Sequence, residues 1–214
     1  MKFLKEIAFI FIVALLFAGL TAGVNYALNR RIKLNDETRF SRQLLDVLNI
    51  KYPKNASPQL IKNIENKRTA KAQIDGMIVY RKFDKSGKPS GYAFDIGGKG
   101  FWGRMKGLLA MKNDLNTISG IIFTSQNETP GLGARVDEPW FRNQFKGIKL
   151  SNAPKKGPYI IIASGSDKKN SVDAITGATM TSKAVDRFLN KDLKQIVSMK
   201  DDIRSAQWPS PQQK

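Results

Sequence analysis

The chain has 214 residues, and its 36 Lys and Arg residues against 18 Asp and Glu give a formal net charge of +18 at pH 7. Hydrophobic residues make up 41% and charged residues 25%, which is typical of a globular chain. The sequence contains no cysteine and no histidine, which excludes thiol nucleophiles, cysteine-ligated iron–sulfur clusters, the usual zinc sites and histidine-based catalytic triads. Any chemistry must therefore come from hydroxyl groups, carboxylates, amines, backbone groups or a bound cofactor.

The excess of positive charge suggests an anionic partner, and the two usual classes are nucleic acid and an anionic membrane surface. The basic residues are scattered, as at Lys62, Lys67, Arg68 and Lys71, rather than gathered into a run with interleaved aromatic residues. This distribution disfavours nucleic acid, and we predict no nucleic-acid partner.

An uncharged segment, IAFIFIVALLFAGLTAGV, follows Lys5 and Glu6. At about 1.5 Å of rise per helical residue it is near the minimum length for spanning a bilayer, and the next residues, NYAL, extend it. We therefore predict a short N-terminal segment over residues 1–6 and a transmembrane anchor over residues 7–28. A cleavable signal peptide is the alternative, with Leu20-Thr21-Ala22 as a poor cleavage site.

Residues 29–69 are typical of a helical stalk. The segment LNDETRFSRQLLDVLNI (34–50) places apolar residues at helical spacing after two capping candidates, and SPQLIKNIENK (57–67) begins with a serine cap followed by proline. At the other end of the chain, residues 204–214 are expected to form a flexible tail.

Residues 70–203 predict a single mixed α+β domain. Short β-rich segments separated by turn residues alternate with two helical segments, and the second helix places Val185, Phe188 and Leu189 on one face. The expected strands are 76–83, 91–96, 105–111, 117–125 and 158–164, and the expected helices are 139–145 and 181–203.

A first motif, GGKGFWG (97–103), follows a predicted strand and satisfies the GxGxxG pattern of dinucleotide-binding folds, with Asp114 downstream. Such a fold would also need a helix and a second parallel strand, whereas MKGLLAM predicts another strand. Two alternatives remain. The segment is either a glycine-rich bend with Phe101 and Trp102 packed into the domain, or a loop in which Gly100 and Trp102 border a flat ligand.

A second motif, NETPGLGARV (127–136), begins with turn residues. Pro130 followed by Gly131 suits the two central positions of a type II turn, and glycine-rich loops expose N–H groups that bind electron-rich atoms. Leu132 is an apolar residue at the tip of this loop. It suggests packing against something flat, although a plain surface loop is the alternative.

A third motif, DAITGATMTSKAV (173–185), gathers hydroxyl groups at the start of a predicted helix. Gly177 and Ala178 remove side-chain bulk beside Thr179, and a helix start presents unpaired N–H groups and the positive end of its dipole to an anion. Hydroxyl groups of Thr176, Thr181 and Ser182 could bind phosphate, and the alternative is that they cap the helix.

The second and third motifs together resemble the FMN-binding domain family. Asp173 and the sequence Thr176-Gly177-Ala178-Thr179 are similar to that family's flavinylation motif, in which a phosphoester joins FMN to the last threonine. The loop ETPGLG resembles its second signature, which lies against the isoalloxazine ring. This loop supplies five residues, which are Glu128, Thr129, Gly131, Leu132 and Gly133.

The resemblance implies a covalent FMN on Thr179, transferred from FAD by a separate flavin transferase that works outside the cytoplasm, with Asp173 as a recognition element. It implies a carrier of electrons with no catalytic residue and no substrate turnover of its own. It further implies a single-pass protein of the bacterial inner membrane, with residues 1–6 in the cytoplasm, the FMN domain on the periplasmic side, and other membrane subunits as partners.

Two membrane complexes carry such domains, one in the C subunit of the Na+-translocating NADH:quinone reductase and the other in the G subunit of the Rnf electron-transport complex. The segment GKGFWGRMKGLLAM (98–111) favours the first, and the second is the alternative. Two other classes remain open. One is a membrane-tethered module that binds an anionic ligand without a covalent bond, and the other is a basic scaffold without a cofactor.

Overall fold

The computed structural model describes residues 2–154, 157–165 and 169–209. Its internal contacts divide the chain into two compact units, Met1–Phe40 and Ser41–Lys214. Helix α1 (Lys2–Val47) supplies the whole described part of the first unit and continues into the second. Its segment Phe3–Asn29 is long and apolar enough to cross a membrane, and none of it is buried.

The helix α1 is continuous where the sequence predicted an anchor and a separate stalk helix beginning near Asn35. No glycine or proline interrupts residues 24–47, and most of these residues are fair helix formers, so nothing in the sequence ends one helix before the next. The compact second unit also begins at Ser41, within the segment predicted as stalk.

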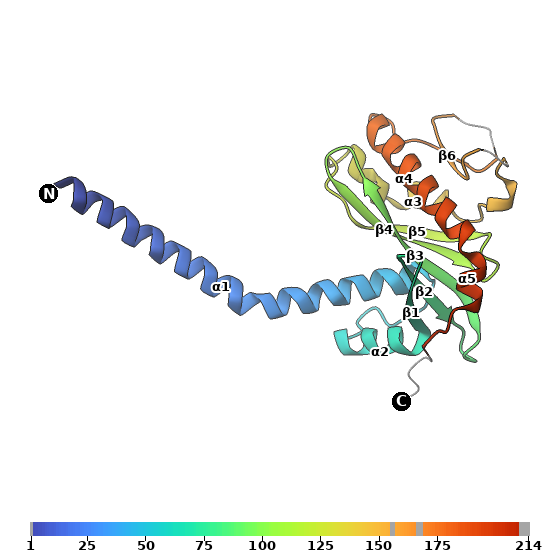
Figure 1. Cartoon of the computed structure of the whole chain (residues 1–214), viewed down its shortest axis with the longest axis horizontal. Coiled ribbons are helices and arrows are strands. Elements are labelled where there is room, and N and C mark those ends of the chain that lie inside the picture. Colours follow the sequence, from blue (N-terminus) through green and yellow to red (C-terminus); the bar gives the residue numbers. More distant parts are fainter. Residues whose placement is uncertain (1, 155–156, 166–168, 210–214) are drawn as a thin grey trace. The chain divides into compact units, whose positions relative to one another are not determined.

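The second unit is built on a five-stranded antiparallel sheet in which every strand pairs with its neighbour in sequence (Figure 1). The fold class is therefore confirmed as a mixed α+β domain. The first strand was not predicted, because its sequence TAKAQI contains mostly residues of low β-propensity. The strands are β1 (Thr69–Ile74), β2 (Met77–Phe83), β3 (Pro89–Lys99), β4 (Arg104–Lys112) and β5 (Ile118–Ser125).

Helix α4 (Thr179–Ser198) packs along one face of the sheet, chiefly on β3 (Figure 1). The predicted apolar face of this helix is buried, with Val185, Leu189 and Leu193 fully inaccessible to solvent. Phe188 lies so close to the backbone of Gly98 that no side chain fits at position 98. The helix ends at Ser198, and a separate short helix, α5 (Lys200–Ser205), follows it.

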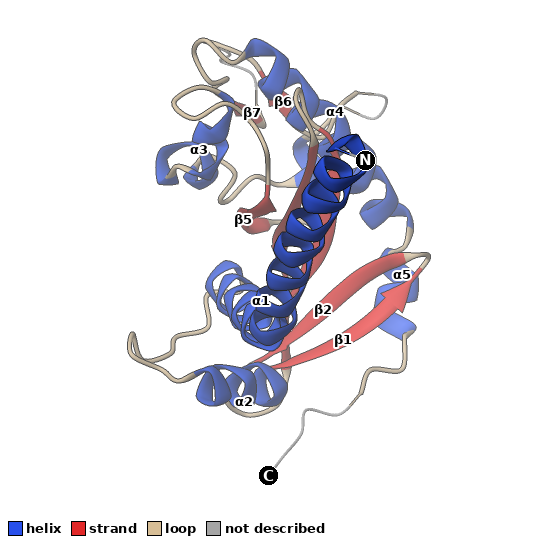
Figure 2. Cartoon of the chain, turned by 90° about the vertical axis from the view of Figure 1, so that its left-hand side faces the viewer, coloured by secondary structure: helices blue, strands red, loops and turns tan. Residues whose placement is uncertain are grey.

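The last turns of α1 and helix α2 (Pro58–Arg68) pack on the opposite face of the sheet, and Figure 2 shows α2 beside β1 and β2. Leu44, Leu45 and Ile61 are fully buried there. The predicted serine cap of the second helix is present, because the Ser57 hydroxyl accepts the Leu60 N–H at 3.2 Å. Much of the segment predicted as stalk is thus part of the domain.

Short elements connect β5 to α4. They are the 3-10 helices η1 (Gly133–Asp137) and η2 (Leu150–Asn152), helix α3 (Pro139–Asn143), and the parallel strand pair β6 (Ile161–Ile162) and β7 (Ser171–Val172). The strand predicted over 158–164 is reduced to two residues. The N–H groups of Ile160 and Ile162 are instead bound by side chains of α4, namely Asn190 and Asp186.

Within the segment 204–214, predicted as a flexible tail, Trp208 contacts the domain. Its indole Nε1 donates to the Ile203 carbonyl oxygen at 3.1 Å, and the Arg81 guanidinium lies 4.3 Å from the centre of the indole ring. A cation over an aromatic face is attractive, and the ring also packs 6.1 Å from Tyr92. Residues 210–214 lie outside the described residues.

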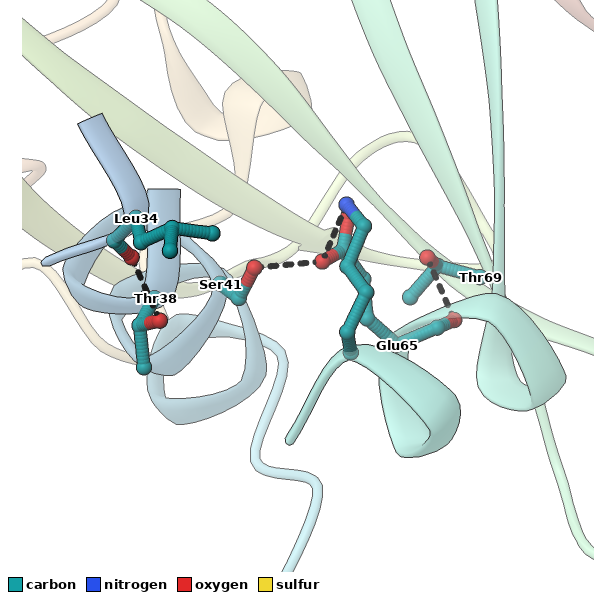
Figure 3. Close-up of polar contacts among 6 residues, drawn as sticks. Leu34, Thr38, Ser41, Glu65 and Thr69 are labelled. Carbon is teal, nitrogen blue, oxygen red and sulfur yellow. Dashed lines mark hydrogen bonds and ion pairs between the residues drawn. The ribbon is translucent and has the colours of Figure 1, made fainter. Parts of the chain in front are cut away.

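A buried carboxylate joins α1 to α2 inside the second unit (Figure 3). The Ser41 hydroxyl donates to Glu65 Oε2 at 2.5 Å, and Lys62 Nζ lies 3.0 Å from the same oxygen. Glu65 is 8% exposed, whereas the Lys62 side chain is 54% exposed. Ser41 is therefore the buried partner on which Glu65 depends.

We expect Ser41→Ala to lower the free energy of unfolding by about 1–3 kcal/mol, because it leaves a buried carboxylate oxygen with one donor fewer. Urea denaturation of the full chain in detergent measures this change. Thr38→Ala is the matched control, because the exposed Thr38 hydroxyl donates only within its own helix, to the Leu34 carbonyl oxygen. The control should change stability by less than about 0.5 kcal/mol, and an equal effect of both substitutions would contradict the expectation.

A candidate flavin site at the start of helix α4

Three segments that are distant in sequence meet around one pocket of about 350 Å³. They are the turn between β3 and β4, the loop that follows β5, and the first turn of α4. The lining residues are Phe101, Trp102, Glu128, Thr129, Leu132, Gly133, Gly177, Ala178, Thr179, Met180 and Thr181. The pocket therefore brings together residues from all three predicted motifs.

The first motif forms a tight hairpin turn. The Gly100 N–H donates to the Gly103 carbonyl oxygen at 2.7 Å, and β4 runs antiparallel to β3 from Arg104 onward. No helix follows the glycines, so the dinucleotide-binding alternative is wrong. Asp114 serves a later turn, where it accepts the N–H groups of Asn116 and Thr117.

The two aromatic residues of this turn do not pack into the domain core. Phe101 is 46% exposed and Trp102 is 68% exposed, and their rings meet edge to face with centres 4.9 Å apart. Both side chains line the pocket. This arrangement fits the alternative in which the turn borders a flat ligand.

The second motif contains the predicted type II turn. The Leu132 N–H donates to the Thr129 carbonyl oxygen at 3.1 Å, and Gly131 has a φ of +75° at the position where this turn requires a positive value. The turn presents Leu132, 44% exposed, at the wall of the pocket. An apolar side chain at a loop tip is thus available to contact a ligand.

The third motif places Thr179 as the first residue of α4, with Ala178 at the N-cap. Alanine has no side-chain acceptor, and no acidic residue lies in the first turn, so the helix start keeps its unpaired N–H groups and positive dipole end. Gly177 has a φ of +78°, which favours glycine. Thr179 is exposed and lines the pocket.

The buried carboxylate of Glu128 connects the three segments. Its Oε1 atom accepts the N–H groups of Phe101 and Trp102 at 2.9 and 3.1 Å, and its Oε2 atom accepts the Thr181 hydroxyl at 2.6 Å. The residue is 5% exposed. The loop motif predicted Glu128 as a site residue, but nothing in the local sequence indicated these partners.

The hydroxyl groups after Thr179 serve the protein itself. Thr181 donates to Glu128, and the Ser182 hydroxyl oxygen accepts the Ile175 N–H at 3.1 Å. The two residues are 3% and 1% exposed. Because the Thr181 proton already has a protein acceptor, this residue is a poor donor for phosphate, and neither residue occupies the N-cap.

Asp173 and Thr176 lie in a neighbouring pocket of about 400 Å³, together with Arg135 and Trp140. Both are exposed, and the Asp173 N–H donates to Gln144 Oε1 at 2.8 Å. Arg135 lies over the Trp140 ring, at 5.3 Å from its centre. These two residues therefore line a different pocket from Thr179, although Thr176 adjoins Gly177 of the first pocket.

Glu138 binds two of the residues that line this second pocket, Arg135 and Trp140. A hydrogen bond from the Trp140 indole and an ion pair with Arg135 lower the pKa of the Glu138 carboxyl group. Sequence reasoning missed both this cluster and two residues of the first pocket, Phe101 and Met180. Phe101 adjoins Trp102 in the first motif and was named only in the alternative in which both rings pack into the domain, whereas Met180 carried no signal beyond its position next to Thr179.

The residues of the first pocket fit FMN. A helix start without an acidic residue suits a phosphate group, and the exposed side chains of Trp102, Leu132 and Met180 offer apolar surface to a flat ring.

Among residues 2–154, 157–165 and 169–209, no cluster of three or more acidic side chains could hold a metal ion.

Comparison with known proteins supports this class. Residues 100–194 match the model of a family described as FMN-binding domain, and this range contains all three segments of the pocket. The predicted resemblance to this family is therefore confirmed over the matched segment.

Within that class, the chain is similar to the C subunit of the Na(+)-translocating NADH-quinone reductase. It is 35% identical to the protein from Haemophilus ducreyi over 132 residues, which are 61% of this chain and 51% of the relative. It is 39% identical to that from Neisseria meningitidis serogroup A over 108 residues, which are 50% and 42% of the two chains. The chain therefore spans about half the length of the curated relatives it matches.

Solved structures agree. The crystal structure of the same type of subunit from Parabacteroides distasonis superposes with a TM-score of 0.65 and 27% identity, covering 84% of this chain and 98% of the other. Shewanella oneidensis NqrC gives a TM-score of 0.61 at 22% identity, over 76% and 99% of the two chains, which shows a shared fold.

We expect Gly100→Ala to destabilise the domain by about 1–3 kcal/mol, as overpacking does in a filled site. A Cβ atom at position 100 would lie 2.5 Å from Glu128 Oε1 and 2.8 Å from the Gly103 carbonyl oxygen. Gly103→Ala is the matched control, because its Cβ would meet only the Asn127 side chain, at 3.3 Å. Urea denaturation should show a change below about 1 kcal/mol for the control, and equal stability of the two variants would refute the close packing.

Proposed function

We propose that this chain is a membrane-anchored flavoprotein subunit that carries FMN by a phosphoester bond to the Thr179 hydroxyl oxygen. In this proposal it relays electrons within an ion-translocating oxidoreductase of the NADH:quinone reductase type. The observation that supports it most directly is the placement of Thr179, which is exposed, begins α4 and lines a pocket with apolar walls.

The helix start would hold the phosphate. Thr179 and Met180 lie in the first turn of α4, where N–H groups have no partner within the helix. These groups and the helix dipole stabilise negative charge without a basic side chain. The exposed Lys183 lies one turn further along and adds positive charge.

The remaining walls would hold the isoalloxazine ring. Leu132 at the tip of the type II turn and Trp102 at the tip of the β3–β4 turn both line the pocket. A ring placed there would cover apolar surface that is otherwise exposed to water, which favours binding. The flavin supplies the redox chemistry when bound, and the chain supplies its position and surroundings.

The two carboxylates of the motifs, Asp173 and Glu128, are poorly placed to act as the base for modification of Thr179. A neutral threonine is a weak nucleophile and needs an adjacent base, yet Asp173 lines a different pocket and Glu128 accepts hydrogen bonds from other groups. We therefore infer that a separate flavin transferase takes up the Thr179 hydroxyl proton, so that the hydroxyl oxygen attacks the FMN phosphorus of FAD and AMP leaves. Exposed Asp173 and Thr176 are suited to recognition by that enzyme.

The first unit would anchor the protein in the membrane. The segment Phe3–Asn29 meets the length and composition of a single span. We propose a bacterial inner-membrane protein whose FMN domain lies on the periplasmic side, with the other membrane subunits of the complex as its partners. The net charge of +18 suits docking to acidic surfaces.

The test is the intact mass of the full chain after co-expression with a flavin transferase. We expect one FMN group per chain, which is lost in Thr179→Val because the attacking oxygen is missing. The group should persist in Thr129→Val, the matched control, since Thr129 lines the same pocket but lies outside the attachment motif. An unmodified wild-type chain, or a group that survives Thr179→Val, would refute the proposal.

The same samples distinguish a module that binds FMN or another anion without a covalent bond. Denaturation followed by filtration removes a non-covalent flavin and leaves a phosphoester in place. Yellow colour that passes the filter from the wild-type chain would therefore favour the non-covalent module, and retained colour supports the phosphoester.

A further inference from the structure

The buried carboxylate of Glu128 is surrounded by hydrogen-bond donors. Its oxygens accept three hydrogen bonds, two from backbone N–H groups and one from the Thr181 hydroxyl, at 2.6–3.1 Å. No ion pair forms to Glu128 among the described residues. A group that accepts from three donors and donates to none behaves as a carboxylate, and the described surroundings hold its charge with dipoles alone.

Two glycines of the motifs lie so close to this carboxylate that a Cβ atom would collide with it. A Cβ atom at Gly100 would lie 2.5 Å from Glu128 Oε1, and one at Gly133 would lie 2.9 Å from Oε2 and 2.5 Å from the Thr181 hydroxyl oxygen. The backbone of both loops therefore closes directly onto the charged group. If residue 128 only filled space, an apolar side chain of similar size would serve at this position.

The carboxylate also lines the pocket proposed for the flavin. Charges in a partly desolvated site interact more strongly than in water, because the effective dielectric constant is lower. Two-electron reduction adds electron density to whatever occupies the pocket, and a fixed negative charge at the wall opposes that addition. This step rests on the proposed function, because it assumes that a flavin occupies the pocket.

We propose that Glu128 sets the redox poise of the bound flavin, and that its negative charge holds the reduction potential below the value that the same pocket would give with a neutral residue. The three hydrogen bonds keep the carboxylate at the wall and prevent it from turning away to solvent. Glu128 is thus an electrostatic residue of the site in addition to a link between its segments.

The competing explanation is purely structural, with Glu128 serving only to join the two loops to α4. Two substitutions separate these roles. Glu128→Gln keeps the length and the acceptor oxygen for the backbone N–H groups but removes the charge. Glu128→Asp keeps the charge but shortens the side chain, so that it cannot span both sets of donors.

The experiment measures the two-electron midpoint potential of the flavinylated full chain in detergent, by equilibration with redox dyes of known potential. For Glu128→Gln we expect the equilibrium to shift about tenfold toward the reduced flavin, which corresponds to a potential about 30 mV higher. For Glu128→Asp we expect a shift below about threefold, together with lower thermal stability. A structural role alone predicts the larger disturbance in the aspartate variant.

Asp192→Asn is the matched control for loss of a buried negative charge. Asp192 is 7% exposed, accepts the Gly97 N–H at 2.9 Å and belongs to α4, like Thr179. It lies thirteen residues further along the helix, about 20 Å away at 1.5 Å per residue. Its loss should lower the stability of the domain and leave the equilibrium between oxidised and reduced flavin within about threefold of the wild type.

An unchanged potential in Glu128→Gln, or an equal rise in Asp192→Asn, would overturn the inference while leaving the attached FMN, and so the proposed function, intact. A wild-type chain without FMN would instead refute the proposed function. If Glu128→Gln does not fold, Thr181→Val provides the test. This substitution removes one hydrogen-bond donor and keeps the carboxylate charge, which is then less compensated. The reduction potential of the flavin should therefore fall, and a rise would contradict the inference.

Discussion

The hydrogen bonds received by the Glu128 carboxylate hold together three parts of the chain that the sheet alone does not connect. The β3–β4 turn and the first turn of α4 both donate to this group, while the loop after β5 supplies it. Burial makes each of these bonds costly to break, because an unsatisfied buried carboxylate has no water to replace a lost donor. The walls of the pocket and the close approach of the backbone at Gly100 and Gly133 depend on this one constraint.

The hydroxyl-rich start of α4 divides into two functions. Thr179 faces solvent at a helix start that has no side-chain cap, while Thr181 and Ser182 point inward and bind Glu128 and the Ile175 N–H. The two buried hydroxyl groups therefore fix the position of the helix, and the exposed one remains available for chemistry. A phosphate group at Thr179 would meet a site whose geometry is already set by its neighbours.

Local chemistry predicted the features that depend on a few adjacent residues. The type II turn at Pro130-Gly131 and the buried face of α4 are of this kind, because φ preferences and helical periodicity act over short distances. Strand β1 was missed because packing overrides its weak propensity. The role of Glu128 and the separation of Asp173 from Thr179 were also out of reach, since each depends on contacts between residues far apart in sequence.

The meander order of the sheet has a consequence for the timing of maturation. Each strand pairs with the one before it, so the sheet can close through short loops as the chain emerges, whereas α4 follows every strand and must wait. Thr179 reaches its final setting only when this last long helix has docked on β3. A transferase that recognises Thr179 at the start of the docked α4 would therefore modify only domains that have finished folding. The attached flavin would then mark the folded chains.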